Sequence, residues 1–281
     1  MTTFSPAAQA VFDKTGIPPI GLGTSGRVGD DGAEAVLSAI EAGYRHIDTA
    51  QAYGSEAPIG MAIQRSGLQR DEFFLTTKVR DTHYPRPEFL ASVERSLEFL
   101  GVEHVDLLLL HWPLTSGAVP FESYMEDLQA VKDRGWSRMI GVSNFSIDYL
   151  KRAEEFLGKG ALTTNQIEIH PYLQNPKMTA YAKAADLTLT AYRPLAEGRV
   201  STDPVLQDIA NRHGTSPATV ALAFLIAEGR IVIPASTNPQ RLRDNLAAQT
   251  LGLSEEEIRR MRRLDRGERF INPAKAPTWD D

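Results

Sequence analysis

Residues 44–56 read Tyr44-Arg45-His46-Ile47-Asp48-Thr49-Ala50-Gln51-Ala52-Tyr53-Gly54-Ser55-Glu56. We interpret this stretch as a short buried strand that ends at the carboxylate of Asp48, followed by a tight loop that carries Tyr53. A helix-like segment over Ser55–Arg65 comes directly afterwards. A strand, a short loop and a helix in this order are the building unit of α/β folds. Further units of the same kind are therefore expected along the chain.

Short apolar runs alternate with longer amphipathic segments along the rest of the chain. Strands are predicted at Pro18–Leu22, Arg45–Thr49, Phe73–Val79, Val105–His111, Arg138–Val142, Thr164–Ile169, Thr188–Tyr192 and Ile231–Pro234. Helices are predicted at Asp31–Ala42, Ser55–Arg65, Glu88–Leu100, Phe121–Arg134, Ile147–Phe156, Lys177–Ala184, Pro204–Arg212, Pro217–Glu228 and Gln240–Ala248. Three helix starts carry a capping residue before a proline, the arrangement that helix N-termini favour, at Asp203-Pro204, Ser216-Pro217 and Asn238-Pro239.

Eight strands that are each followed by a helix predict an α/β fold, with a parallel sheet closed into a (β/α)8 TIM barrel. A capping box formed by Ser254 and Glu257 predicts an additional C-terminal helix. The residues from about Gly267 onward lack periodicity, and we interpret them either as a loose tail or as a loop over the barrel mouth. The chain shows no repeat, low-complexity tract or linker-like change of composition, so residues 1–281 are predicted to form a single domain.

An open, doubly wound sheet is the alternative arrangement of alternating strands and helices. Such a sheet normally carries a glycine-rich nucleotide-binding loop after its first strand. The stretch Gly21-Leu22-Gly23-Thr24-Ser25-Gly26 resembles that loop, but a lone match of this kind is usually only a turn. The barrel is therefore the favoured prediction.

Composition narrows the class of protein. The chain has 281 residues and 42% hydrophobic content, enough to bury a large core without cross-links, and it has no cysteine for disulfides or thiolate metal sites. A formal net charge of −6 argues against broad nucleic-acid binding. No uncharged apolar segment approaches the roughly 20 residues that span a bilayer, and the N-terminus has no secretion signal. We therefore expect a cytoplasmic protein without nucleic-acid or membrane partners. The lack of any long apolar patch in the sequence favours a monomer.

Polar residues collect at the predicted carboxyl ends of the strands, where TIM barrels place their active sites. They are Asp48, Tyr53, Lys78, His111, Ser143, Asn144, Gln166, Tyr192, Ser236, Thr237 and Asn238. Each has a purely structural explanation on its own, because an Asp can cap a loop, a Lys can extend to solvent and a His can be a hydrogen-bonded core residue. Several titratable groups at consecutive strand ends are harder to explain structurally, since the rim would then bury unpaired charge.

The four titratable residues fit proton transfer to a substrate oxygen. A free tyrosine has a pKa of about 10, which is too high for efficient proton transfer at neutral pH. The ammonium of Lys78 would lower the pKa of Tyr53, and Asp48 would hold that ammonium in place. His111 would donate a hydrogen bond to the same oxygen. Together these groups could polarise a carbonyl and protonate the alkoxide left by hydride attack.

Hydride chemistry requires a carrier, and the sequence offers no metal site. The six histidines show no paired spacing typical of zinc ligands, so a nicotinamide cofactor is predicted. TIM barrels commonly bind phosphate at the loops after strands seven and eight and at a helix N-terminus. The segment Pro234-Ala235-Ser236-Thr237-Asn238-Pro239, with Arg241 in the first helical turn, fits such a site.

Taken together, these motifs resemble those of the aldo-keto reductases over nearly the whole chain. The stretches that carry the resemblance are Gly21–Thr24, Gly43–Glu56, Leu100–Val102, Asp106–Pro113, Ile140–Phe145, Asn165–Tyr172, Ala191–Leu195 and Ile233–Asn245. The short loop after His111 and the ending Ala276-Pro277-Thr278-Trp279-Asp280 resemble the bacterial 2,5-diketo-D-gluconate reductase branch. The resemblance implies a barrel that reduces aldehydes and ketones with NADPH. Its substrates would be small dicarbonyls such as methylglyoxal, aromatic aldehydes, keto sugars or keto acids.

The resemblance also implies a role for each matching residue. The catalytic set is Tyr53 as proton donor, Lys78 and Asp48 as the groups that tune its pKa, and His111 as the group that orients the carbonyl. The cofactor set is Ser143, Asn144 and Gln166 at the nicotinamide carboxamide, Tyr192 stacked on the nicotinamide ring, Leu195 at the pyrophosphate, and Ser236, Thr237, Arg241 and Asn245 at the adenosine phosphate. The residues expected to shape the substrate pocket are Trp112, Val79 and Trp279.

Two residues depart from the family pattern. Ala235 stands where relatives commonly have a lysine, and the loss of one charged hydrogen bond lowers affinity about tenfold to a hundredfold. Arg241 still favours NADPH, but discrimination against NADH should be weaker than in a lysine-bearing relative. Arg193 stands where many relatives have a small polar residue, and it either contacts phosphate or faces solvent.

Two other functions are kept in view. A non-catalytic regulatory subunit that binds a nicotinamide cofactor could share the fold, although the complete set of Asp48, Tyr53, Lys78 and His111 argues against it. An isomerase or aldolase could use Lys78 as a Schiff-base nucleophile, but the neighbouring Asp48 would keep the amine charged and non-nucleophilic.

Overall fold

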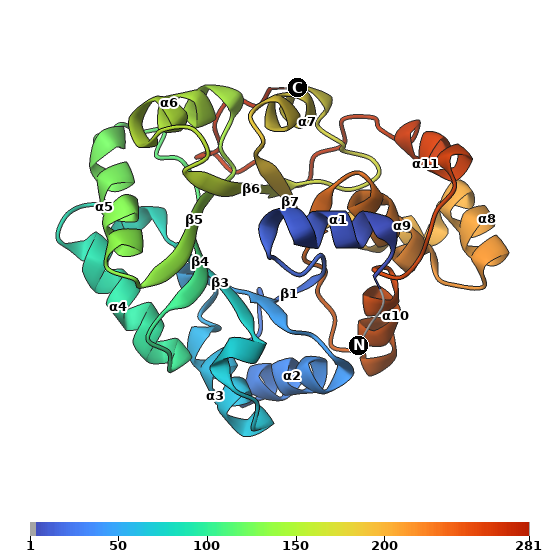
Figure 1. Ribbon diagram of the computed structural model, residues 1–281, viewed down its shortest axis with the longest axis horizontal. Coiled ribbons are helices and arrows are strands. Elements are labelled where there is room, and N and C mark those ends of the chain that lie inside the picture. Colours follow the sequence, from blue (N-terminus) through green and yellow to red (C-terminus); the bar gives the residue numbers. More distant parts are fainter. Residues whose placement is uncertain (1–3, 281) are drawn as a thin grey trace.

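The computed structural model describes residues 4–280 and shows eight parallel strands arranged in chain order (Figure 1). The strands are β1 (Gly21–Gly23), β2 (His46–Asp48), β3 (Phe74–Val79), β4 (Val105–Leu110), β5 (Ser137–Ser143), β6 (Leu162–Glu168), β7 (Thr188–Tyr192) and β8 (Arg230–Val232). An isolated parallel bridge joins Ile20, just before β1, to Val232 of β8 and closes the sheet. The predicted TIM barrel is thus confirmed, although β1, β2 and β8 are shorter than predicted.

Helices surround the strands (Figure 1). Within the described range they are α1 (Pro6–Thr15), α2 (Gly29–Ala42), α3 (Glu56–Ser66), α4 (Glu88–Leu100), α5 (Phe121–Asp133), α6 (Ile147–Leu157), α7 (Pro176–Ala184), α8 (Pro204–His213), α9 (Pro217–Ala227), α10 (Pro239–Ala247) and α11 (Glu255–Arg262), with 3₁₀ segments η1 (Gln51–Tyr53), η2 (Arg70–Glu72), η3 (Asp81–His83) and η4 (Ala196–Thr202). α11 is the predicted additional helix, and Ser254 and Glu257 form its capping box. The sequence patterns above do not predict α1, although Ser5 caps it by accepting a hydrogen bond from the Ala8 N–H at 3.3 Å.

Side chains alternate between the barrel interior and the outer helix layer along each strand, as pleating requires. On β4, Leu109 belongs to the inner cluster, and Leu110 packs with the helices outside. The register pairs Lys78 of β3 with Leu109 and Val79 with Leu110. Pleating therefore places the Lys78 side chain inside the barrel and turns Val79 outward.

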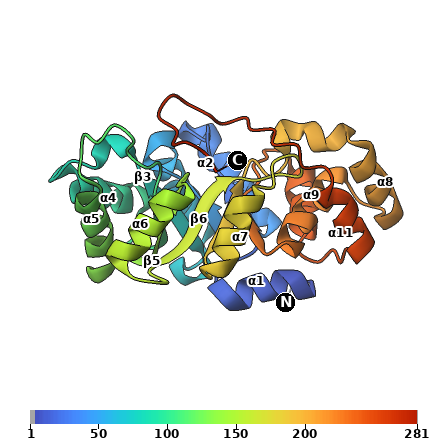
Figure 2. The same ribbon diagram turned by 90° about the horizontal axis from the view of Figure 1, so that it is seen from above.

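The helix α1 closes the amino-terminal end of the barrel (Figure 2). Its Val11 packs in an inner cluster with Phe74, Leu107, Leu109 and Ile231 from the strands. This end of the barrel is filled by apolar side chains and leaves no room for polar chemistry. A site must therefore lie at the opposite end, the mouth formed by the carboxyl ends of the strands.

The C-terminal tail, residues 267–280, runs across that mouth (Figure 2). Of the two interpretations of this segment, a loop over the barrel mouth is confirmed. The carboxylate of Glu168, at the end of β6, is fully buried and accepts hydrogen bonds from the N–H groups of Phe270 at 2.8 Å and Ile271 at 2.7 Å. Near the end of the tail, the Asp280 carboxylate accepts a hydrogen bond from the Ile147 N–H at 3.0 Å. The tail is thus fixed at both ends.

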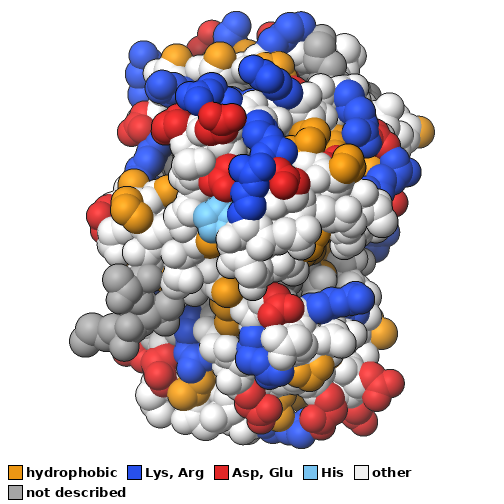
Figure 3. Space-filling model, turned by 90° about the vertical axis from the view of Figure 1, so that its right-hand side faces the viewer, with side chains coloured by type: hydrophobic (Ala, Val, Ile, Leu, Met, Phe, Trp, Pro, Cys, Tyr) orange, Lys and Arg blue, Asp and Glu red, His pale blue; other side chains and the backbone are white. Residues whose placement is uncertain are grey.

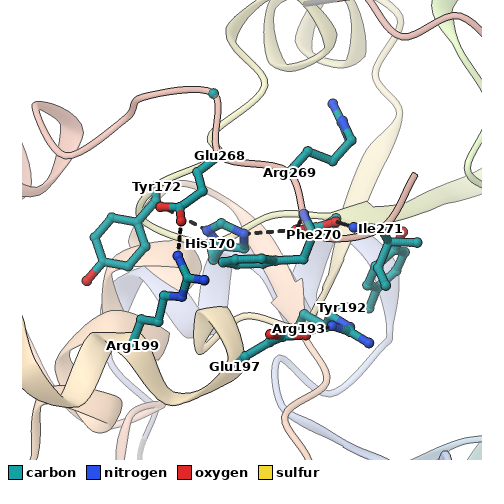
Figure 4. Close-up of polar contacts among 12 residues, drawn as sticks. His170, Tyr172, Tyr192, Arg193, Glu197, Arg199, Glu268, Arg269, Phe270 and Ile271 are labelled. Carbon is teal, nitrogen blue, oxygen red and sulfur yellow. Dashed lines mark hydrogen bonds and ion pairs between the residues drawn. The ribbon is translucent and has the colours of Figure 1, made fainter. Parts of the chain in front are cut away.

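A histidine completes the inner anchor of the tail (Figure 4). The Tyr172 N–H donates to His170 Nδ1 at 3.3 Å, so the ring proton lies on Nε2, which donates to Glu168 at 3.0 Å. Three N–H groups therefore point at one carboxylate. Burial raises the pKa of Glu168, but the hydrogen bonds from His170, Phe270 and Ile271 outweigh it and hold the pKa below its ordinary value of 4.5.

The face at the right of Figure 1 carries mixed charge (Figure 3). Asp208 on α8 pairs with Arg212 on the same helix at 2.9 Å and with Arg260 on α11 at 2.8 Å. Hydrophobic side chains on this face are scattered and do not gather into a patch. It therefore looks like an ordinary solvated surface. Across residues 4–280, none of the helices has the length and apolar character needed to cross a membrane.

Replacing Glu168 with Gln should loosen the tail, because an amide presents one acceptor oxygen and an NH₂ group to backbone N–H donors. Near neutral pH we expect the free energy of unfolding, measured by urea titration, to fall by about 1.5–3 kcal/mol. The folded pKa of Glu168 is lowered, so this stabilisation is fully present above the ordinary value of 4.5 that the carboxyl has in the unfolded chain. It should be lost as the pH falls through the lower, folded pKa.

Glu256→Gln is the matched control, because Glu256 is exposed and its ion pair with Arg259 spans 3.9 Å. This change should alter the free energy of unfolding by less than about 0.5 kcal/mol. A Glu168→Gln protein as stable as the control at every pH would show that this carboxylate does not hold the tail.

Candidate active site

A cavity of about 870 Å³ opens at the barrel mouth. Its walls come from the carboxyl ends of seven of the strands, from η4 and from the start of α10. The sequence-predicted residues that line it are Asp48, Tyr53, His111, Trp112, Ser143, Asn144, Gln166, Tyr192, Leu195, Ser236, Arg241 and Asn245. Residues far apart in the chain are thus brought to one place.

A buried ion pair lies at the base of this cavity. Lys78 Nζ donates to Asp48 Oδ1 at 2.5 Å and to the Thr49 carbonyl oxygen at 2.7 Å, and the exposed fractions of the two charged side chains are 0% and 2%. Asp48 Oδ2 accepts a hydrogen bond from Gln166 Nε2 at 2.7 Å. Burial alone lowers the pKa of Lys78, but Asp48 raises it above its ordinary value. Lys78 therefore stays charged. It does not line the cavity itself, but it contacts Asp48 and Tyr53, which do.

Tyr53 lies beside this pair, on the 3₁₀ segment after β2. Lys78 Nζ is 5.0 Å from the centre of the Tyr53 ring, and the His111 ring meets that ring edge-on with centroids 5.5 Å apart. Burial raises the pKa of Tyr53, and the charge of Lys78 only partly offsets the rise. Lys78 acts on the pKa of Tyr53 in the predicted, lowering direction, but in the protein alone burial outweighs the ammonium. The phenol keeps its proton at neutral pH.

His111 is neutral in this site. Burial lowers its pKa, and the charges of Lys78 and of Lys275 on the tail lower it further, to about 3. The Asn144 side chain donates to the His111 carbonyl oxygen at 3.0 Å, which fixes the end of the strand. A neutral imidazole can still donate one N–H hydrogen bond to a substrate oxygen, without adding a second positive charge next to Lys78.

Four polar residues form a connected cluster beside the ion pair. Ser143 Oγ donates to the Gln166 carbonyl oxygen at 2.8 Å. Asn144 Nδ2 donates to Ser143 Oγ at 3.1 Å, and the Tyr192 hydroxyl donates to Asn144 Oδ1 at 2.8 Å. Asn144 adopts a left-handed backbone with φ of 62°, which asparagine tolerates better than most residues. The cluster offers amide and hydroxyl groups for a carboxamide. Through Gln166 it is also joined to Asp48, a contact that the sequence does not predict.

The other end of the cavity carries groups suited to phosphate. Asn238 caps α10 by accepting a hydrogen bond from the Arg241 N–H at 3.0 Å. The positive end of this helix therefore lies where Ser236 and Arg241 line the cavity. Asn245 lines the same end and is only 3% exposed. Thr237, which was predicted with these residues, is exposed and is not part of the lining.

Two of the three residues predicted to shape the substrate pocket lie elsewhere. Trp112 lines the cavity. Val79 is fully buried in the outer core, because the pleat of β3 turns it away from the barrel interior. Trp279 of the tail packs edge-on against Trp112 with ring centroids 6.2 Å apart. It therefore supports the wall of the cavity without lining it.

The cavity also has lining residues that the sequence does not reveal. Ile271 of the tail is one of them, and Glu197, Gly198, Val200 and Ser201 of η4 are others. η4 is not a regular helix, since Glu197 and Gly198 have φ values of 55° and 89°. No periodic pattern marks such a segment. The available signal is its position after β7, where barrels place functional loops.

His111 should not titrate between about pH 5 and 8, the range in which an ordinary histidine changes charge, because its pKa is about 3. The chemical shifts of its ring protons, followed by NMR across this range, should stay constant. A His111→Gln variant identifies the signal. An inflection of that signal between about pH 6 and 7 would contradict the neutral assignment.

Comparisons with known proteins agree with this geometry. The model of the Aldo/keto reductase family matches residues 19–266. Methylglyoxal reductase DkgB of Yersinia pestis is 41% identical over 265 residues, which cover 94% of this chain and 99% of that protein. The 9,11-endoperoxide prostaglandin H2 reductase of Trypanosoma cruzi is 37% identical over 258 residues, which cover 90% of each protein.

Solved structures share the whole fold. A protein assigned as a 2,5-diketo-D-gluconic acid reductase B has a TM-score of 0.89 and 38% identity, with 100% of this chain and 98% of that chain covered. The aldose reductase of Schistosoma japonicum has a TM-score of 0.88 and 31% identity, with 94% of this chain and 96% of that chain covered. Sequence and structure therefore agree from end to end: the chain belongs to the aldo/keto reductase family and is an oxidoreductase.

Proposed function

We propose that this protein reduces aldehydes and ketones to alcohols, with NADPH as the hydride source and Tyr53 as the proton donor. One observation carries the proposal. A protonated Tyr53 lies in the same cavity as neutral His111 and next to the buried Lys78–Asp48 pair. Carbonyl reduction is also the reaction that the names of the relatives indicate for those proteins.

The residues present fit a nicotinamide dinucleotide. Tyr192 offers an aromatic face at one end, beside the amide of Asn144. At the other end, Arg241 offers a guanidinium that forms no ion pair with any residue in the range 4–280 and so can accept a phosphate. A volume of about 870 Å³ lies within the range of cofactor and ligand sites.

The chemistry divides between the cofactor and the protein. A bound reduced nicotinamide supplies the hydride, and the protein acts at the carbonyl oxygen. His111 and Tyr53 donate hydrogen bonds to this oxygen, and Tyr53 passes its proton on as negative charge develops there. The ammonium of Lys78 stabilises the phenolate that remains. The burial that raises the resting pKa of Tyr53 keeps the proton in place until that moment.

The names of the relatives suggest which class of carbonyl compound this protein reduces. The relatives include a methylglyoxal reductase and a protein assigned as a 2,5-diketo-D-gluconic acid reductase. We propose small dicarbonyls such as methylglyoxal, aromatic aldehydes, keto sugars or keto acids as substrates of this protein. We further propose that it works as a monomer in the cytoplasm, in line with its net charge of −6.

Two other functions fit the site less well. A non-catalytic cofactor-binding subunit would not need the complete set of Asp48, Tyr53, Lys78 and His111, which the barrel brings together at one place. A Schiff-base role for Lys78 conflicts with its raised pKa, because Asp48 keeps the amine charged and a charged amine is not nucleophilic.

Tyr53→Phe removes the transferable proton and keeps the ring. With methylglyoxal or an activated aromatic aldehyde, kcat should fall at least about a hundredfold, followed as loss of reduced-nicotinamide absorbance. The Kd for NADPH should change little, because the hydroxyl is proposed to contact the acceptor. Tyr181→Phe is the control, since that partly buried phenol bonds Glu154 at 3.4 Å and does not line the cavity. Full turnover by Tyr53→Phe would refute the proposal, and a wild-type protein that binds NADPH without turnover would favour the regulatory subunit.

Cofactor preference should depend on one arginine. Arg241→Gln should weaken NADPH binding about tenfold to a hundredfold and leave NADH unchanged, because only NADPH carries a phosphate on the 2′ oxygen of its adenosine ribose. Ala235 lines the cavity where a lysine is absent, so the wild-type preference for NADPH should stay below about a thousandfold. Ala235→Lys should raise that preference. Kd values for both cofactors, taken from protein fluorescence, test this, and a wild-type preference above that limit would contradict it.

A further inference from the structure

The cavity holds an ion pair that the proposed chemistry does not use. Arg193, directly after β7, pairs with Glu197 of η4, and both residues line the cavity. Figure 4 shows the two side chains together next to Tyr192. Within residues 4–280, the arginines in the lining are Arg193 and Arg241. Since Arg241 lies at the α10 end, Arg193 supplies the guanidinium closer to the Tyr192 end.

The backbone between the two partners is unusual. Arg193, Ala196 and Glu197 all have left-handed backbones, with φ values of 50°, 48° and 55°. Such conformations are unfavourable for residues other than glycine and tend to occur at functional sites. A half-exposed ion pair is too weak to hold them by itself. The segment is instead anchored by Ala196 and Val200, which are fully buried. The Glu197 side chain can therefore leave Arg193 while the backbone stays in place.

We propose that Arg193 binds an anionic group of the bound ligand, and that Glu197 is an internal anion that occupies the guanidinium until the ligand replaces it. A guanidinium presents paired N–H donors that match phosphate and carboxylate oxygens. In the protein alone, Glu197 Oε1 accepts a hydrogen bond from one of these donors, Nη1 of Arg193. An incoming anion competes with the Glu197 carboxylate for the guanidinium, because two anions beside one guanidinium repel each other.

The position of Arg193 points to the pyrophosphate of the cofactor as the source of this anion, and this part rests on the proposed function. Tyr192 and Asn144 lie at the nicotinamide end of the proposed site, and Arg241 lies at the adenosine phosphate end. Arg193 follows Tyr192 directly and precedes Leu195 of the lining. Lys78 is fully buried and already paired with Asp48, so it cannot take this role. A carboxylate on the acceptor is the second source with the same chemistry.

Binding measurements on the whole protein separate these sources. Kd values for NADP⁺, NAD⁺ and inorganic pyrophosphate are measured by calorimetry. Arg193→Gln should weaken NADP⁺ and NAD⁺ by the same factor, about tenfold or more, because both carry a pyrophosphate. Arg241→Gln should weaken only NADP⁺. Glu197→Gln should tighten both cofactors several-fold, since it removes the internal competitor, and this gain should vanish in the Arg193→Gln/Glu197→Gln double variant.

A matched control comes from the surface of α4. Arg95 and Glu88 form an ion pair with side-chain exposures of 45% and 43%, close to the 40% and 48% of Arg193 and Glu197. Arg95→Gln and Glu88→Gln should leave every Kd unchanged. This control separates a local effect at the cavity from a general effect of surface charge.

The outcomes are distinct. If Arg193→Gln leaves both cofactor affinities unchanged but raises KM for 4-carboxybenzaldehyde and not for 4-nitrobenzaldehyde, the anion site stands and its ligand is the acceptor. If Glu197→Gln weakens binding as much as Arg193→Gln does, the pair is merely structural and the proposal is overturned. Unchanged cofactor, pyrophosphate and acceptor values in Arg193→Gln would also overturn it. If the wild-type protein binds neither dinucleotide, the proposed function fails, and the loss of pyrophosphate binding in Arg193→Gln still decides the anion site.

Discussion

The buried ion pair between Asp48 and Lys78 is the interaction on which the rest of the site depends. Two charges removed from water are tolerated only when their remaining hydrogen-bonding capacity is used. Here Lys78 also donates to the Thr49 carbonyl, and Asp48 also accepts from Gln166. These groups come from the ends of β2, β3 and β6, so only a closed barrel brings them together. Removing one partner would leave an uncompensated charge, at a loss of about 3–5 kcal/mol.

The two ends of the barrel have different roles: one end is a packed apolar core, and the other end carries the candidate active site. The end closed by α1 is filled with apolar side chains such as Val11 and Leu109, and the opposite end carries the polar cavity. At the mouth of the barrel, the strand β6 contacts both the buried ion pair and the C-terminal tail. Gln166 and Glu168 stand two residues apart on β6 and so point to the same side of the strand. The first bonds Asp48 of the ion pair, and the second fixes the tail that brings Ile271 into the cavity.

The sequence predicts those features of the fold and the site that leave a pattern within a short stretch of residues. Buried runs such as β4 and strand-terminal polar residues such as Asp48 and His111 mark the barrel and the core of its site, because parallel strands bring their carboxyl ends together. The Glu168 anchor depends on tail residues about 100 positions away, and no local pattern encodes it. η4 is irregular and leaves no periodicity. Val79 is expected in the substrate pocket from the sequence, but the pleat of β3 turns it into the outer core. The pKa of Tyr53 depends on burial, which a sequence does not state.

Burial then explains which groups of the site carry charge. It raises the pKa of Tyr53 and lowers the pKa of His111, so both stay neutral and both keep a hydrogen to donate. The same burial would lower the pKa of Lys78, but the charge of Asp48, with a smaller contribution from Tyr53, raises that pKa and keeps the amine charged. Before any reaction, the charged groups among these four residues are therefore Lys78 and Asp48, whose charges cancel. Proton transfer from Tyr53 would create the next charge on a ring whose centre lies 5.0 Å from the ammonium. Asp48 thus helps to keep a cation beside the phenolate that this transfer would leave.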